Sequence, residues 1–286
     1  MSNAIVHLNG EFKPIEQAHV SVLDRGFLFG DGVYEVIPVY GGRLFRLDQH
    51  LQRLARSLAA IRIDNPHPLE QWREILHELV QHNGGGEQSL YLQITRGVAP
   101  RNLAFPVGTT PTVFAMASPV HLRSGVVQGV DAIVVEDSRW LHCDIKAITL
   151  LPAVLLRQQA VEHGAAEAIM LRNGLLTEGA ACNVFIVRNG VAITPPHSER
   201  LLPGITRDLL VELCHQHAIP CEERNVSEAE LRSADEVWLT SSPSGVLPVI
   251  RLDGATVGNG APGPLWHTLS DLYRQYQNDF RAGLVS

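Results

Sequence analysis

The spacing of apolar residues predicts two amphipathic helices near the beginning of this 286-residue chain. Four apolar side chains share one helical face, and Asp48 just before them is a plausible helix cap. A second helix with the same spacing ends before a glycine-rich turn at 83–86. β-Branched and alternating runs predict strands at 33–40, 89–95 and 111–117. The two apolar faces consist of Leu51, Leu54, Leu58 and Ile61, and of Trp72, Ile75, Leu76 and Leu79.

The second part of the chain is expected to contain more strands, and these are shorter. Two Asn-Gly pairs, at 173–174 and 189–190, are typical of tight hairpin turns. Ser227 and Glu230 match a capping box, which predicts a short helix. The remaining pattern predicts strands at 132–136, 167–171, 183–187 and 236–240, and helices at 152–163, 206–217 and 264–277.

This change of pattern predicts an α+β protein of two domains. A polar stretch that contains glycine, 118–129, separates the two parts. We expect a smaller N-terminal α/β domain at 1–119, a linker at about 120–125 and a larger C-terminal domain at 126–286.

Composition excludes several classes of protein. The net charge of −7 argues against a nucleic-acid-binding surface, and no apolar run reaches the length of a transmembrane helix. The first residues lack the basic and apolar regions of a signal peptide. Four cysteines without a CxxC pair suit a reducing compartment, so we expect a cytoplasmic protein.

Lysine is scarce in this chain, which contains 23 lysines and arginines in total. Only Lys13 and Lys146 are lysines, and lysine can act as an amine nucleophile where arginine cannot. Lys13 lies in a polar segment that predicts a solvated turn. Lys146 has apolar neighbours, which would lower its pKa as Schiff-base chemistry requires. The structural alternative is a lysine that extends from a strand edge into water.

Two other motifs carry no function. Residues 258–263 match GxGxxG, but they lie too close to the end of the chain for a dinucleotide-binding βαβ unit. His77 and His82 are one residue too far apart for the HExxH zinc motif. We therefore expect no metal site.

Several segments could together bind a phosphorylated cofactor. Residues 202–207 lead into a helix, whose N-terminal N–H groups and Thr206 hydroxyl would form an anion site. Ser241 and Ser242 follow a strand, and Arg53 offers a guanidinium fork. Each feature also has an ordinary alternative, a turn after a strand or an arginine at the surface.

Glu178 follows a predicted hairpin and lies among small residues. A carboxylate in this position could hold a proton on a heteroaromatic nitrogen. Taken alone, the segment favours a turn glutamate that faces water.

Four segments, in order along the chain, resemble the class IV aminotransferases, which use pyridoxal phosphate. The resemblance extends from about Leu8 to Leu252. Within the class, the sequence Arg-Trp-Leu-His-Cys-Asp-Ile-Lys at 139–146 most resembles that of the D-amino acid aminotransferases. The resemblance to the family implies fold type IV, with a smaller N-terminal α/β domain and a larger, β-barrel-like cofactor-binding domain with helices. The four segments are 24–36, 139–146, 177–185 and 203–208.

The resemblance implies a role for each matching residue. Lys146 would carry pyridoxal phosphate as a Schiff base, and Glu178 would pair with the pyridine nitrogen. Tyr34 and Arg101 would receive the substrate carboxylate, with Arg101 reaching in from the other subunit of a homodimer. The phosphate would be surrounded by Arg53, Ile205, Thr206, Ser241 and Ser242, the isoleucine through its backbone N–H.

The implied activity is ping-pong transamination between a D-amino acid, such as D-alanine, and a 2-oxo acid, such as 2-oxoglutarate. Lys146 would move the α-proton as a general base and acid. Stereochemistry would depend on which side of the pocket holds the carboxylate.

Two departures from the family pattern concern the site. The carboxylate trap usually reads Arg-x-His, but Leu103 replaces the histidine and removes one polar partner. Ala180 and Ala181 replace hydroxyl residues, so the other phosphate donors matter more. Three alternatives stay open: a branched-chain L-amino acid aminotransferase, a 4-amino-4-deoxychorismate lyase on the same fold, and a cofactor-binding protein without activity.

Overall fold

The computed structural model describes residues 4–120 and 128–285, which divide into two compact units. The first unit comprises Met1–Arg123, Ile145–Thr149 and Asp279–Ser286, and the second comprises Ser124–Asp144 and Leu150–Asn278. Nearly all of the predicted linker at about 120–125 lies outside the described residues. The predicted domain boundaries therefore stay a prediction.

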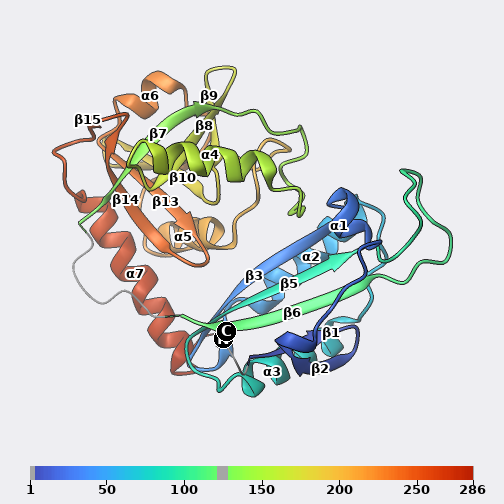
Figure 1. The fold of residues 1–286 in the computed structure, drawn as a ribbon. Coiled ribbons are helices and arrows are strands. Elements are labelled where there is room, and N and C mark those ends of the chain that lie inside the picture. Colours follow the sequence, from blue (N-terminus) through green and yellow to red (C-terminus); the bar gives the residue numbers. More distant parts are fainter. Residues whose placement is uncertain (1–3, 121–127, 286) are drawn as a thin grey trace. The chain divides into compact units, whose positions relative to one another are not determined.

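The first unit contains an antiparallel sheet of six strands in the order β2-β1-β6-β5-β3-β4 (Figure 1). The longest pairing joins β3 to β5, from Gly32 opposite Thr95 to Val39 opposite Gln88. The strands predicted in this part are confirmed to within two residues. The six strands are β1 (Ile5–Leu8), β2 (Glu11–Pro14), β3 (Gly32–Tyr40), β4 (Arg43–Leu44), β5 (Gln88–Thr95) and β6 (Thr112–Pro119).

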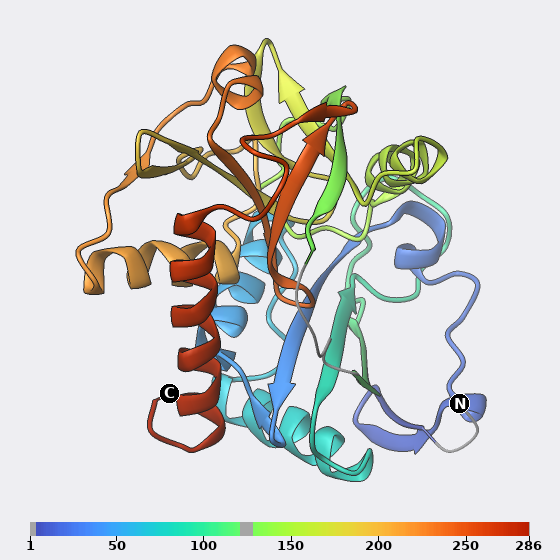
Figure 2. The same ribbon diagram turned by 90° about the vertical axis from the view of Figure 1, so that its left-hand side faces the viewer.

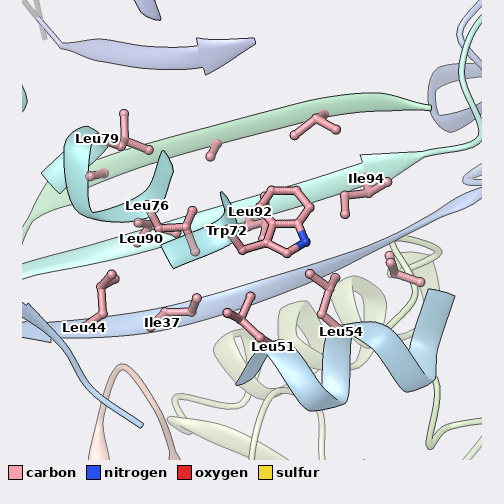
Figure 3. Close-up of a cluster of buried hydrophobic side chains, with 14 of the residues drawn as sticks. Ile37, Leu44, Leu51, Leu54, Trp72, Leu76, Leu79, Leu90, Leu92 and Ile94 are labelled. Atoms are coloured by element: carbon pink, nitrogen blue, oxygen red, sulfur yellow. The ribbon is translucent and has the colours of Figure 1, made fainter. Parts of the chain in front are cut away.

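Two predicted helices, α2 (Leu47–Ala60) and α3 (Leu69–His82), are confirmed and supply the core of the first unit. Trp72 from α3 is 1% exposed and lies among leucines of the sheet and of α2 (Figure 3). Leu51 and Leu54, predicted to share a face of α2, are both buried in this cluster. The apolar spacing along the chain thus identifies the packed faces. Two shorter elements, η1 (Ile15–Gln17) and α1 (Arg25–Phe29), precede β3.

Asp48 does not cap α2, so this prediction is wrong. The helix begins at Leu47, two residues earlier than a cap at Asp48 would give, and its N-cap is Arg46, whose φ of 50° places it in the left-handed region. Asp48 lies in the first turn, where a negative charge is favourable, and its Oδ1 is 2.7 Å from Nη2 of Arg73.

Lys13 lies in strand β2, so the prediction that it lies in a turn is wrong. Its side chain is 26% exposed, and its Nζ is 2.6 Å from Oε2 of Glu11 on the same strand. The two residues share one face of the strand because side chains alternate with a period of two.

The second unit contains a nine-stranded sheet with the path β12-β11-β10-β13-β14-β7-β8-β9, and β15 pairs with β14. Figure 2 shows β7, in green, beside β14, in orange-red, in a parallel pair. Four strands separate β9 from β10 along the sheet, yet only residues 180–182 join them in sequence. The sheet must therefore curl until β9 approaches β10, which gives the expected barrel-like form. The strands are β7 (Val130–Glu136), β8 (Glu167–Arg172), β9 (Leu175–Gly179), β10 (Asn183–Arg188), β11 (Val191–Thr194), β12 (Cys221–Glu223), β13 (Glu236–Ser241), β14 (Gly245–Leu252) and β15 (Ala255–Thr256).

Strand β8 is buried on both faces, which explains its continuous apolar run. Ile169 and Leu171 face the core of the curled sheet, while Ala168 and Met170 face helix α4. The helices are α4 (Leu151–Glu162), α5 (Ile205–Gln216), α6 (Glu228–Arg232) and α7 (Pro264–Arg281).

Local signals in this part are confirmed. Asn173 and Asn189 both have positive φ at the predicted hairpin turns. Ser227 and Glu230 form the predicted capping box at the start of α6. Within the described stretches, each helix is too short or too polar to cross a bilayer.

Candidate active site

Lys146 belongs to a short segment, 145–149, that lies along the edge of β3 in the first unit. The Lys146 carbonyl accepts a hydrogen bond from the backbone N–H of Tyr34 at 3.0 Å. Its own N–H donates to Oγ of Ser57 on α2 at 3.3 Å. Ala147 forms a bridge with Val33 on the same edge. The backbone of Lys146 is therefore fixed by both a strand and a helix.

The structure brings the Lys146 side chain close to the Tyr34 ring. The half-buried Lys146 Nζ lies 4.1 Å from the centroid of the Tyr34 ring, a cation–π contact. The ring of Tyr91 lies 5.6 Å from that of Tyr34. Burial, with a smaller contribution from Tyr34, raises the pKa of Tyr91 to about 12. At neutral pH the Tyr91 hydroxyl is therefore neutral, and it donates to Gln93 at 2.7 Å.

Arg53 is 3% exposed, so the alternative that it is a surface residue is wrong. Its guanidinium forms a two-pronged ion pair with the fully buried carboxylate of Glu35. Nε donates to Oε1 at 2.8 Å, and Nη2 donates to Oε2 at 2.6 Å. His50 Nδ1 lies 2.7 Å from the same Oε2. Glu35 thus sets the orientation of Arg53.

The electrostatics of this cluster follow from its burial. Burial raises the pKa of Glu35, but the charge and hydrogen bonds of Arg53 and His50 outweigh it and lower the pKa to about 2. Burial lowers the pKa of His50 despite the attraction of Glu35, and the charges of Arg53 and Lys146 lower it further. At neutral pH Glu35 and Arg53 are therefore both charged, whereas His50 is neutral. His50 Nε2 is buried and has no hydrogen-bond partner among the described residues.

Arg101 lies in an exposed loop after β5. Its Cζ is 5.5 Å from the centroid of the Phe29 ring. Leu103, which replaces the expected histidine, is 80% exposed. An arginine presented on an exposed loop is free to meet a ligand that approaches from outside this unit.

In the second unit, Glu178 is only 4% exposed, so the alternative of a solvated turn is wrong. Oε1 accepts a hydrogen bond from Arg139, and Oε2 accepts from Asn183 Nδ2 at 3.2 Å and from the Leu202 N–H at 3.1 Å. Arg139 also pairs with Asp137, from Nε and Nη2, at 2.9 Å each. Such donors stabilise the ionised form of Glu178. The carboxylate is thus held in one orientation.

Asn183 connects Glu178 to the predicted anion site. Its Nδ2 also donates to the carbonyl of Leu202 at 2.9 Å. A Cβ on Gly204 would lie 1.9 Å from Asn183 Oδ1, so glycine is required there. Gly204 precedes α5 without a side-chain cap, which leaves the first N–H groups of the helix for another acceptor.

The predicted phosphate residues of the second unit lie close to the same point. Ile205 and Thr206 begin α5 and are buried. Thr240 pairs with Asn183 in the sheet and immediately precedes Ser241 and Ser242. The Oγ1 of Thr240 is buried and has no hydrogen-bond partner within the described ranges. Glu178, the start of α5 and the end of β13 are therefore gathered around Asn183.

Sequence reasoning missed four residues of these clusters. Glu35 interrupts an apolar strand, and His50 lies one helical turn from both Leu47 and Leu54; a polar group buried at such positions requires partners. Arg139 and Asn183 lie within segments that carried the resemblance, but their contacts with Glu178 depend on the tertiary fold.

Comparison with known proteins identifies the family of this chain. The family model described as amino-transferase class IV matches residues 32–252. The D-alanine aminotransferase of Bacillus licheniformis is 44% identical over 261 residues, 91% of this chain and 92% of the relative.

Solved structures share the fold. The branched-chain amino acid aminotransferase of Escherichia coli superposes with a TM-score of 0.88 at 29% identity, covering 100% of this chain and 96% of that one. The branched-chain aminotransferase of Thermoproteus uzoniensis, with norvaline, gives 0.87 at 31% identity, covering 96% and 94%. A further branched-chain enzyme, solved with pyridoxamine 5'-phosphate, gives 0.90 at 26% identity, covering 100% and 96%.

The family match covers most of the chain. One unit is a sheet with helices and the other is barrel-like, and both fit fold type IV. The likeness to an enzyme solved with pyridoxamine 5'-phosphate agrees with the cofactor expected from the sequence. The chain therefore belongs to the class IV aminotransferases, the pyridoxal-phosphate-dependent transaminases of that fold.

Proposed function

We propose that this protein transfers amino groups between D-amino acids, such as D-alanine, and 2-oxo acids, such as 2-oxoglutarate. The observation that carries this proposal is the 44% identity to a D-alanine aminotransferase over 91% of the chain. The second candidate is transamination of branched-chain L-amino acids, supported by the likeness to branched-chain enzymes at 26–31% identity.

The chain's residues fit pyridoxal phosphate. The buried Glu178 carboxylate suits a protonated pyridine nitrogen, and the open start of α5 suits a phosphate. Thr206, Ser241 and Ser242 add hydroxyl groups, and the orphaned Thr240 hydroxyl marks a polar place that a ligand can satisfy. The Ile205 N–H and the Arg53 guanidinium, held by Glu35, complete the phosphate set. When bound, pyridoxal phosphate supplies an electron sink for the carbanion formed at the substrate α-carbon.

The chain itself binds the substrate and moves its proton. Tyr34 and Arg101 bind the substrate carboxylate and orient the α-hydrogen. Lys146 Nζ accepts the α-proton as a general base and returns a proton as a general acid. Glu178 keeps a proton at the pyridine nitrogen, because Arg139, Asn183 and the Leu202 N–H keep its carboxylate ionised and in place.

The role of Lys146 can be tested directly because the chain has only one other lysine. Borohydride reduction of the pyridoxal-phosphate enzyme, followed by peptide mapping, should attach the cofactor to Lys146. Lys13, in an ion pair with Glu11 at 26% exposure, is the internal control. Label on Lys13, or on neither lysine, would contradict the role of Lys146.

Arg101 acts, in this proposal, in the site of a second copy of the chain. Four apolar side chains of its loop are exposed, which supports burial against another subunit. Mixing Lys146→Ala with Arg101→Ala subunits should restore about a quarter of parental activity, because hybrid dimers keep one complete site. A mixture as inactive as its components would refute the role in trans. The four exposed residues are Val98, Leu103, Phe105 and Val107.

Turnover separates the remaining alternatives. D-alanine with 2-oxoglutarate should give pyruvate over many turnovers, whereas D-alanine alone should give at most one pyruvate per bound cofactor. A lyase would release pyruvate from 4-amino-4-deoxychorismate without an amino acceptor, and a cofactor-binding protein would catalyse neither reaction.

We also infer a cytoplasmic location because all four cysteines are free thiols, which fractionation of cells can test.

A further inference from the structure

The exposed loop that carries Arg101 is held from beneath by a buried side chain. Arg25, at the start of α1, is 3% exposed. Its Nη1 donates to the carbonyl of Asn102 and, at 3.4 Å, to that of Ala104, while Nη2 donates to the Leu103 carbonyl at 3.3 Å. One guanidinium therefore contacts the three carbonyl groups that follow Arg101.

Asp31 joins Arg25 to a second buried arginine, Arg96. Its Oδ2 accepts from Nε of Arg25 at 2.7 Å and from Nε of Arg96 at 2.8 Å, and its Oδ1 accepts from Nη2 of Arg96 at 3.0 Å. Burial raises the pKa of Asp31, but these two arginines outweigh it and hold the pKa below its ordinary value. Asp31 is thus ionised at neutral pH and binds both guanidinium groups.

Arg96 fixes the far end of the same loop. Its Cζ lies 3.7 Å from the centroid of the Phe105 ring, a close cation–π contact. Its Nη2 also donates to the Ile61 carbonyl at 2.7 Å, and its Nη1 donates to the Arg62 carbonyl at 2.9 Å. Phe105 is therefore tied to a guanidinium that is itself immobilised.

A third contact concerns Arg101 itself. The ring of Phe29, at the end of α1, lies 4.8 Å from the Cζ of Arg25 and 5.5 Å from that of Arg101. The same buried arginine thus contacts the loop backbone and the ring beside the Arg101 side chain.

We propose that Arg25, Asp31 and Arg96 are positioning residues for Arg101 and thereby set the affinity for the substrate carboxylate. The proposal rests on the proposed function, in which Arg101 binds that carboxylate. A loop without helix or strand loses conformational entropy when it is fixed, and the three residues fix it before substrate arrives. The hydrogen bonds described for the two arginines join the loop backbone, Asp31 and the carbonyls at 61–62, so their loss should weaken binding far more than it slows proton transfer.

The test compares Arg25→Lys with the parent in stopped-flow half-reactions of the pyridoxal-phosphate enzyme with D-alanine. A lysine keeps the charge but cannot contact three carbonyl groups at once. The apparent Kd for D-alanine should rise about 10- to 100-fold, the usual cost of a misplaced binding group. The limiting rate and the Kd for pyridoxal phosphate should stay near the parental values.

Arg43→Lys is the matched control. Arg43 also donates to a carbonyl, that of Phe280, and its Cζ lies 4.7 Å from the Phe280 ring centroid, in the same unit. Its Kd for D-alanine should equal that of the parent. Phe105→Leu changes a residue that is 53% exposed, so it keeps the test open if Arg25→Lys fails to fold. It should raise the Kd in the same direction, by less.

Two results would overturn the proposal while leaving the proposed function intact. One is a parental Kd in the variants of Arg25 and Phe105. The other is an equal loss of limiting rate and affinity in Arg25→Lys, as general structural damage would give. A parent enzyme that does not react with D-alanine would instead refute the proposed function, and this proposal with it.

Discussion

Replacing Glu35 with glutamine should destabilise the first unit strongly, because the buried Arg53 guanidinium loses the carboxylate with which it forms a two-pronged ion pair. The pKa of Glu35 falls from its ordinary value of 4.5 to about 2 in the folded protein. A difference of about 2.5 units corresponds to about 3 kcal/mol of folding free energy. The folded pKa is depressed, so this stabilisation is fully present above pH 4.5 and is lost as the pH falls towards 2. Removing one partner of a buried ion pair usually costs about 3–5 kcal/mol, which agrees with the value obtained from the pKa of Glu35.

Hydrogen exchange of β3 and α2 amides, measured on cofactor-free protein near pH 7, gives the free energy of opening without a contribution from cofactor binding. Glu87→Gln is the matched control. Glu87 also forms a two-pronged pair, with Arg281 at 3.0 and 3.3 Å, but its side chain is 29% exposed. An exposed pair contributes about 0–1 kcal/mol. Equal losses in the two variants would refute the reasoning that burial makes the Glu35 pair important.

Of three further predictions, two concern the chemistry and one concerns the N-cap of α6. Glu178→Gln should retain pyridoxal phosphate in a cofactor titration but slow α-proton abstraction in stopped-flow by about a hundredfold or more; a parental rate would make Glu178 a structural residue. Leu103→His should strengthen D-alanine binding in half-reactions by about 1.5–3 kcal/mol, the value of a hydrogen bond to a charged group, and an unchanged Kd would show that Leu103 does not limit the trap. Ser227→Ala should lower the free energy of urea unfolding by about 1 kcal/mol, whereas Ser227→Thr, which keeps the hydroxyl that donates to Glu230, should retain most of it; equal stability of all three proteins would mean that the α6 cap contributes nothing.

Local patterns predicted the elements whose residues interact over short distances along the chain. The apolar spacing of α2 and α3 and the Asn-Gly turns depend on neighbouring residues, and both are confirmed. The start of α2 was misplaced because Arg46 adopts a left-handed conformation that no local signal indicates. The short strands β1 and β2 were missed because each has only four residues.

The site was predictable only in part. The sequence indicated Lys146 and Glu178, but it could not indicate that residues 145–149 pair with the edge of β3, since 114 positions separate Ala147 from its partner Val33. The same limit applies to Asn183, whose contacts join Glu178 to the start of α5. Buried polar partners such as Glu35 become recognisable only when tertiary structure shows what surrounds them.

The central claim, transamination of D-amino acids, is tested most directly by half-reaction spectroscopy with paired enantiomers. The pyridoxal-phosphate enzyme is mixed with D-alanine, L-alanine, D-leucine or L-leucine, and the cofactor absorbance is followed. We expect rapid bleaching with D-alanine, recovery on addition of 2-oxoglutarate, and much slower reaction with either L-amino acid. Faster bleaching with L-leucine than with any D-amino acid would contradict the claim and favour a branched-chain aminotransferase.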